Sequence, residues 1–215
     1  MSDVRRFLST WWLNRKASVA VLFDRKGDAV EDLRRILQIK PHDEVARGAL
    51  GNLLSETGDQ AGAVAEFEAL VRQNPSNAEA WFNLGYLHEQ RDDLAAAEDA
   101  FRRAVALKPS IDRAWYGLGL VLVREGRLEE SLDAFHRTIK LQPFSPYGFY
   151  QLGMTLHHLG RTSEAARVCE DLRKFEPRYA ATLARDIERT APQAAAPSSP
   201  TAATSATKEE TAVPS

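Results

Sequence analysis

Proline recurs in this chain at a fixed step of 34 residues. The prolines in this register are Pro41, Pro75, Pro109, Pro143 and Pro177. A Leu-Gly pair recurs at the same step, at residues 50–51, 84–85, 118–119 and 152–153. A fixed period of this length is typical of repeat proteins, in which each repeat is one small structural unit. The chain is therefore expected to fold as a row of similar units stacked on one another.

The other residues in register indicate what each unit contains. Aromatic residues share one position (Trp81, Trp115, Phe149), glycines a second (Gly58, Gly126, Gly160), alanines a third (Ala63, Ala97, Ala165) and phenylalanines a fourth (Phe67, Phe101, Phe135). Within one unit, Trp81, Leu84, Gly85 and His88 have the i, i+3, i+4, i+7 spacing of one helix face. Glycine suits the turn that follows, and each proline ends a second helix. Each unit is thus predicted to be a pair of helices.

This pattern resembles the tetratricopeptide repeat, or TPR, whose unit is a helix–turn–helix of the same length. The match is best in "AWFNLGYLHEQRDDLAAAEDAFRRAVALKP", residues 80–109. The resemblance implies an all-α fold, a right-handed TPR superhelix (α-solenoid) of antiparallel helix pairs. Full units are expected at residues 44–77, 78–111, 112–145 and 146–179.

The two ends of the chain depart from the repeat. Residues 1–43 are interpreted as a degenerate N-terminal unit, in which Gly27 lies only 14 residues before its proline, whereas Gly58 lies 17 before its own. A shortened second helix is therefore expected there. Residues 180–190 are predicted to form a C-terminal capping helix with Leu183 and Ile187 on its apolar side. Residues 191–215 are rich in Ala, Pro, Ser and Thr, which predicts a disordered tail.

Composition indicates an ordinary soluble chain with no strong bias in charge. The chain of 215 residues is 44% hydrophobic and 27% charged with a net charge of -2, so net charge does not favour binding to nucleic acid or an anionic membrane. Cys169 is the only cysteine and replaces the phenylalanine of the other units. It forms no internal disulfide, which fits a reducing compartment, and we expect a cytoplasmic protein.

Candidate functional residues lie on the first helix of each unit. One face of this helix packs on its partner helix, and the resemblance implies that the opposite face lines a concave groove for a peptide or helix of another protein. The spacing selects Asn52, Phe82, Asn83, Tyr86, Arg113, Tyr116, Leu120, Arg124, Tyr147, Tyr150, Gln151, Met154 and His157. Phe82, Tyr116 and Tyr150 have an alternative role, since they are also placed to pack on the neighbouring unit.

Three of these residues suggest a more specific ligand. Asn52, Asn83 and Arg113 resemble three of the five positions with which co-chaperone TPR domains clamp the C-terminal carboxylate of heat-shock chaperones. Gly48 and Gly117 occupy the other two positions, where that family carries basic side chains. Their absence removes much of the charge-assisted hydrogen bonding. Recognition of a peptide backbone in general is therefore predicted in preference to a carboxylate clamp.

No catalytic, cofactor-binding or metal-binding constellation is evident in the sequence. His157 and His158 are adjacent and diverge by about 100° on a helix, so they do not form a metal-ligand pair. The sequence therefore predicts a noncatalytic adaptor or scaffold that binds another protein, with self-association left open.

An alternative function arises from the N-terminus. Val4, Phe7, Leu8 and Trp11 form a helical stripe flanked by basic residues, which is typical of helices that bind membrane surfaces. On this interpretation the protein is an envelope-associated assembly factor. The same aromatic segment is also suited to cover the exposed first face of the stacked units.

Overall fold

The computed structural model describes residues 9–10, 12–13, 15–17, 20 and 25–190, and this part of the chain is all-α. The residues described between 9 and 20 are helical. The helices that follow are α2 (Lys26–Ile39), α3 (Glu44–Glu56), α4 (Gln60–Gln73), α5 (Ala78–Gln90), α6 (Leu94–Leu107), α7 (Asp112–Arg124), α8 (Leu128–Leu141), α9 (Pro146–His158), α10 (Thr162–Arg173) and α11 (Pro177–Thr190). The expected tail, residues 191–215, lies outside the described residues.

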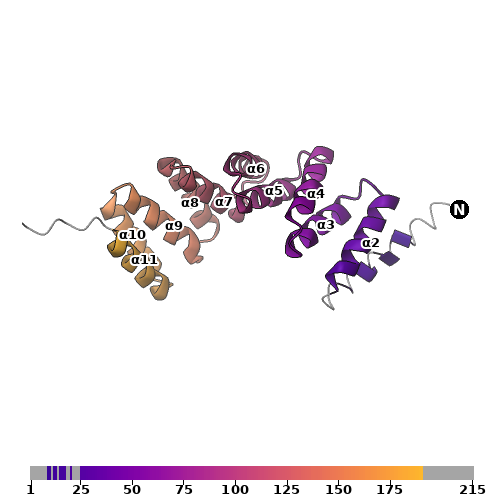
Figure 1. Cartoon of the computed structure of the whole chain (residues 1–215). Helices are drawn as coiled ribbons and strands as arrows, with labels where there is room; N and C mark the ends of the chain where they lie inside the picture. Colours follow the sequence, from indigo (N-terminus) through magenta and orange to yellow (C-terminus); the bar gives the residue numbers. More distant parts are fainter. Residues whose placement is uncertain (1–8, 11, 14, 18–19, 21–24, 191–215) are drawn as a thin grey trace, which may run out of the picture.

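The helices pack in sequence order, as a solenoid does. Each helix from α2 to α11 contacts the next one along the chain. The first helices of successive pairs also touch, because α5 contacts α7 and α7 contacts α9. Figure 1 shows the result, a curved row that runs from α2 at one end to α10 and α11 at the other. The predicted all-α solenoid of helix pairs is thus confirmed.

Glycine forms the turn inside three of the pairs. Gly58, Gly126 and Gly160 have φ angles of 88°, 77° and 73°, in the left-handed region that residues with a Cβ rarely adopt. The remaining pair, α5 and α6, has Asp92 at this place with a φ of 64°. Aspartate tolerates this conformation better than most residues do. The 34-residue register therefore holds in the backbone even where the glycine is replaced.

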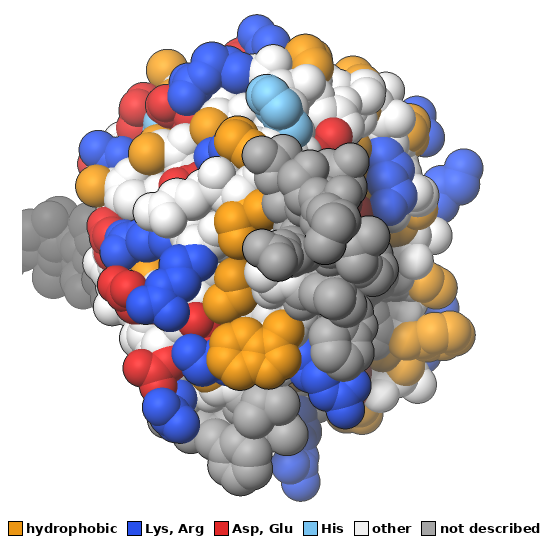
Figure 2. All heavy atoms as spheres, turned by 90° about the vertical axis from the view of Figure 1, so that its right-hand side faces the viewer, with side chains coloured by type: hydrophobic (Ala, Val, Ile, Leu, Met, Phe, Trp, Pro, Cys, Tyr) orange, Lys and Arg blue, Asp and Glu red, His pale blue; other side chains and the backbone are white. Residues whose placement is uncertain are grey.

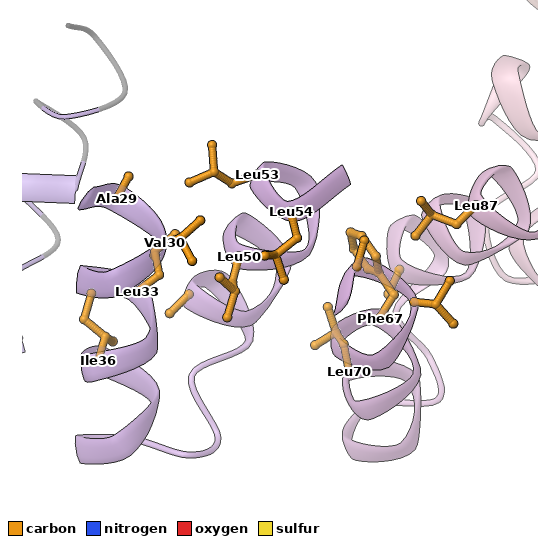
Figure 3. Close-up of a cluster of buried hydrophobic side chains, with 14 of the residues drawn as sticks. Ala29, Val30, Leu33, Ile36, Leu50, Leu53, Leu54, Phe67, Leu70 and Leu87 are labelled. Atoms are coloured by element: carbon orange, nitrogen blue, oxygen red, sulfur yellow. The ribbon is translucent and has the colours of Figure 1, made fainter. Parts of the chain in front are cut away.

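The expectation of a shortened helix near the N-terminus is wrong. Helix α2 has 14 residues, the same length as α4, α6 and α8. Gly27 does not mark a turn before this helix, because it lies within the first turn of α2 itself. Side chains from α2 build the first part of the core, where Val30 and Leu33 point towards Leu50 and Leu53 of α3 (Figure 3).

Close approach of the two helices in three of the pairs depends on a glycine facing a phenylalanine ring. A Cβ built on Gly51 would lie 2.7 Å from the Phe67 ring, and one on Gly119 would lie 2.5 Å from the Phe135 ring. These distances are shorter than van der Waals contact, so the ring fills the space that a side chain would need. Both rings are almost completely buried. The Leu-Gly pairs of the sequence therefore mark where the helices touch.

The last unit replaces this contact with one from α11. Cys169 stands where the other units have phenylalanine, and Gly153 is approached instead by Leu183 of α11, 2.7 Å from a Cβ built on the glycine. Leu183 and Ala180 are fully buried, and the Cys169 thiol lies 3.4 Å from the Ala180 carbonyl oxygen. Helix α11 therefore closes the core by occupying the place of the missing ring.

The start of the second helix is stabilised differently in the two halves of the chain. Asp59 and Asp93 cap α4 and α6 by accepting hydrogen bonds from the backbone N–H of Gly62 and Ala96. The equivalent residues before α8 and α10 are Arg127 and Arg161, which make no such cap. Both arginines instead form ion pairs with the preceding unit, Arg127 with Glu98 at 2.7 Å and Arg161 with Glu129 at 3.0 Å.

We expect loss of Arg127 to lower stability in a pH-dependent way. Burial raises the pKa of Glu98, but hydrogen bonds from Arg102 and Arg127 outweigh it and hold the pKa below its usual value. A carboxylate with a lowered pKa stabilises the fold above its unfolded pKa of about 4.3, and this stabilisation is lost as pH falls through the folded value. Arg127→Ala should therefore lower Tm by about 1–2 °C at pH 7. The difference should shrink as the pH falls below about 4.3 and vanish only below the lowered pKa of Glu98.

Thermal unfolding followed by circular dichroism between pH 3 and pH 8 measures this effect. Arg91→Ala is the control, because Arg91 is exposed and forms no ion pair with the described residues. An equal, pH-independent shift in both variants would contradict the proposed role of the arginine.

Candidate functional site

The candidate site is the surface formed by the first helices of the pairs, α3, α5, α7 and α9, which we call the groove. These helices carry every residue that the sequence analysis selected. Two hollows open on the groove, and Arg113 lines both of them. The arrangement follows from the fold, because the opposite side of each first helix is used for packing on its partner.

The first hollow lies between α3, α5 and the start of α7 and has a volume of about 460 Å³. It brings together five of the selected residues, Asn52, Phe82, Asn83, Tyr86 and Arg113. They come from three successive units, so no single repeat could form this hollow. Its walls combine aromatic surface with amide and guanidinium groups, which suits a ligand that presents both a backbone and side chains.

Three polar side chains of the first hollow have no hydrogen-bond or ion-pair partner among the described residues. The side-chain amides of Asn52 and Asn83 make no hydrogen bond with the described residues. The Arg113 guanidinium lies 4.8 Å from the centre of the Phe82 ring and has no ion pair in the described part of the chain. Stacking on an aromatic face holds a guanidinium in place without using its N–H donors. Arg113 is thus positioned but not neutralised.

Phe82 has a structural role as well. It is 9% exposed, and its ring centre lies 6.2 Å from that of Phe101 in the core. Phe82 therefore both supports Arg113 and contributes to the core, with Phe101 of its own unit as its ring partner.

The second hollow lies between α7, α8 and the start of α9 and has a volume of about 500 Å³. Tyr116 and Tyr147 line it together with Arg113. The sequence analysis did not select the other residues of its wall, Asp112, Thr138, Gln142 and Ser145. Thr138 and Gln142 lie on or directly after a second helix, which was treated as packing surface only. The sequence does contain a signal for Gln142. A polar residue recurs directly before three prolines of the repeat, as Asn74, Lys108 and Gln142.

The sequence-predicted residues towards the C-terminus are engaged within the protein. The Tyr150 hydroxyl donates a hydrogen bond of 2.7 Å to Asp186 of α11, and this bond, with burial, raises the pKa of Tyr150. Met154 packs against the cluster that contains Leu183. Leu120 packs against a separate core cluster that contains Phe135 and Leu152. Neither hollow is lined by these residues or by Gln151 and His157.

Arg124 is also engaged within the protein. Its guanidinium pairs with Glu89 at 2.9 Å and with Asp92, which lie at the end of α5 and in the turn after it. The structure thus places this arginine at the junction of two units, outside both hollows.

One of the two missing basic positions has a steric cause. A Cβ built on Gly117 would lie 2.6 Å from the Phe101 ring, so no basic side chain fits there unless the core shifts. The same atom on Gly48 would lie 3.7 Å from Leu70, which is an ordinary contact distance. The groove therefore offers one cation, Arg113, at the place where the carboxylate clamp uses several.

The structure does not test the alternative of a membrane-binding stripe at the N-terminus. Val4, Phe7, Leu8 and Trp11 lie outside the described residues. Nearby, Trp12 is 57% exposed and the Lys16 amine lies 5.6 Å from its ring centre. Figure 2 shows this end of the molecule, where basic, acidic and hydrophobic side chains are mixed over the visible described surface. Among the described helices, none combines the length and the apolar character needed to cross a bilayer.

The described residues also contain no group of three or more His, Cys, Asp or Glu side chains arranged to hold a metal ion.

Comparison with known proteins addresses the family. The sequence model described as "Tetratricopeptide repeat" matches residues 49–112, 108–146 and 116–181. No curated protein shows significant sequence similarity to the chain.

Several solved structures share the fold. A MamA protein is 23% identical with a TM-score of 0.74, covering 80% of this chain and 94% of its own. MamA from Desulfovibrio magneticus RS-1, from residue 41 to its end, is 20% identical with a TM-score of 0.73, covering 79% and 96%. YrrB, described as a TPR protein with an unusual peptide-binding site, is 21% identical with a TM-score of 0.69, covering 80% and 88%.

Identities this low establish the likeness of fold alone. The sequence model, by contrast, covers more than half of the chain. With its helix pairs, its left-handed turns and its glycine–ring contacts all in a 34-residue register, the chain belongs to the tetratricopeptide repeat family.

Proposed function

We propose that this protein is a cytoplasmic, noncatalytic adaptor that holds an extended segment of another protein in its groove. The observation that carries the proposal is the first hollow, where three uncommitted polar side chains from three units, Asn52, Asn83 and Arg113, surround aromatic surface. TPR proteins generally mediate protein–protein interaction. The peptide-binding site named for YrrB is a property of that protein, and it makes peptide recognition on this fold a reasonable class of function.

The chemistry of the groove favours a peptide backbone with an acidic side chain. Carboxamides offer both a donor and an acceptor, which matches the N–H and C=O groups of an extended chain. The positioned guanidinium of Arg113 favours a carboxylate, because such a pair is charge-assisted. Tyr86 and Tyr116 supply aromatic surface in the first and second hollow respectively, and aromatic side chains contribute much of the binding energy of interfaces.

A selection from a random dodecapeptide display library tests the proposal. The wild-type chain should enrich a peptide family that Asn83→Ala and Arg113→Ala variants bind about tenfold more weakly in fluorescence anisotropy titrations. Arg72→Ala is the matched control, because it removes an exposed arginine from α4, outside both hollows. Circular dichroism verifies that every variant is folded.

The proposal fails if the wild type enriches no peptide. It also fails if the enriched peptides bind the Asn83→Ala and Arg113→Ala variants as tightly as they bind the wild type.

A further inference from the structure

An exposed aromatic surface lies beside the second hollow, at the connections that join α8 to α9 and α10 to α11. It consists of Phe144, Tyr147, Phe175 and Tyr179, which we call the aromatic edge. Phe144 is 78% exposed and Tyr147 57% exposed. Two edge-to-face pairs join the connections, Phe144 with Phe175 at 6.0 Å and Tyr147 with Tyr179 at 5.9 Å between ring centres. The rings are therefore held in place, while Phe144 and Tyr147 keep much of their surface open to solvent.

The repeat itself does not require aromatic residues at these positions. The residues equivalent to Phe144 in the earlier units are His42, Ser76 and Ser110, and those equivalent to Tyr147 are Val45, Glu79 and Arg113. The packing role in this unit belongs to Phe149, which is half-buried and lies 5.2 Å from Phe175. Phe144 and Tyr147 thus add apolar surface that the fold can do without, and such surface marks an interaction site when it is contiguous.

The charges along the aromatic edge indicate the kind of partner. Lys140 lies four residues before Phe144, and Arg178 directly precedes Tyr179. Both side chains are exposed and neither forms an ion pair with the described residues. By contrast, the neighbouring Lys174 is paired with Asp171 at 2.7 Å. With Arg113 at the adjoining hollow, three unpaired basic side chains face two unpaired carboxylates of this region, Asp112 in the hollow and Glu176 beside Tyr179. The excess of positive charge favours an acidic partner.

The aromatic edge is continuous with the groove because Tyr147 belongs to both. This side chain lines the second hollow and also pairs with Tyr179 on α11. A segment that leaves the second hollow over Tyr147 would therefore meet Phe144 and Tyr179 next.

We infer that the partner segment continues from the second hollow across the aromatic edge, and that it is an acidic peptide with an aromatic residue among its carboxylates. Its aromatic side chain packs on Phe144 and Tyr179, and its carboxylates face Lys140 and Arg178. This inference rests on the proposed function, to which it adds a second contact surface and the composition of the partner.

The test repeats the dodecapeptide selection with a variant taken from the chain's own repeats. Phe144→Ser introduces the residue that two other units carry at this position, so the fold should tolerate it. Val45→Ser is the matched control, since Val45 is 82% exposed but lies on α3, far along the solenoid from the aromatic edge, and lines neither hollow. Peptides enriched by the wild type and by Val45→Ser should carry Asp or Glu on both sides of an aromatic residue, and Phe144→Ser should not enrich them.

Titration of one enriched peptide then separates the aromatic and charge contributions. Binding should weaken about tenfold with Phe144→Ser and with Arg178→Ala, and about as much when the peptide's Glu residues are replaced by Gln. Raising the salt concentration should weaken the native peptide more than the Gln version.

Failure of this inference is distinguishable from failure of the proposed function. If Arg113→Ala abolishes binding but Phe144→Ser leaves the affinity unchanged, the groove binds peptide and the aromatic edge does not. If sedimentation shows a wild-type dimer that Phe144→Ser dissociates, the edge is covered by a second copy and the inference is overturned. Flotation with phosphatidylserine vesicles that depends on Phe144 would overturn it in favour of a lipid surface.

Discussion

Phe101→Ala is expected to destabilise the protein by about 3–5 kcal/mol, the range for truncating a buried aromatic side chain. The ring is 2% exposed and lies between two glycines on different helices. A Cβ on Gly85 would lie 2.8 Å from it and one on Gly117 2.6 Å. Because neither glycine has a side chain that can move into the space, the cavity would stay open and the full cost would apply.

The same substitution should also divide the solenoid. Phe101 belongs to α6, and Gly85 and Gly117 belong to α5 and α7, so the ring joins one pair to the next. In a repeat protein the free energy of unfolding is roughly a sum over units and their interfaces, and a weakened interface lets the two sides unfold separately. Urea unfolding followed by far-UV circular dichroism should therefore show a lower midpoint and a shallower transition.

Phe144→Ala is the control for this measurement. It removes the same atoms from a side chain that is 78% exposed, and a change within about 0.5 kcal/mol is expected. A loss below about 1 kcal/mol for Phe101→Ala would show that α5 and α7 close around the cavity, contrary to the rigid contact described here.

Cys169→Phe is expected to displace α11. The substitution restores the residue that the other units carry, but Leu183 already fills the space beside Gly153. Ring and leucine cannot both occupy it, and overpacking a core costs about 1–3 kcal/mol. If α11 leaves instead, the burial of Leu183 and Ala180 and the hydrogen bond between Tyr150 and Asp186 are lost.

Amide hydrogen exchange measured by mass spectrometry tests this expectation. Amides in residues 177–190 should exchange faster by at least about tenfold in the variant, whereas those of α3 to α6 should be unchanged. Cys169→Ala is the control, because the small alanine does not compete with Leu183 for the space beside Gly153. The amides of α11 should therefore stay protected in this variant. Unchanged protection of α11 in Cys169→Phe would mean that the ring finds another place in the core.

Much of the fold could be predicted from the sequence because the same packing contacts recur in successive units. The recurring Leu-Gly pairs and the phenylalanines that face them determine how two helices meet, and one interpretation fits every unit but the last. Gly27 matches the glycine of a turn in sequence, and only the hydrogen bonds of the backbone show that it lies within a helix. The role of Leu183 was also hidden, since its partner Gly153 is 30 residues away and no other unit repeats the contact.

The candidate site was less predictable than the fold. Helical spacing selects the residues of one helix face, and this placed Asn52, Asn83 and Arg113 on the groove side of three helices. It does not show which of them already have partners, so Arg124 and Tyr150 were selected although both are bound within the protein. Thr138 and Gln142 were missed because the second helix was assigned to packing alone. Pairwise contacts between units decide these cases, and periodicity carries no information about them.

The change from aspartate to arginine at the start of the second helices bears on how such an array can be altered by recombination. A unit whose second helix is capped by Asp59 or Asp93 supplies the cap from its own sequence. It can therefore be copied or exchanged and still start its second helix. Arg127 and Arg161 each pair with a glutamate of the unit before, in addition to glutamates of their own unit. An exchange that separates such a unit from the one before it therefore removes one ion pair of its arginine.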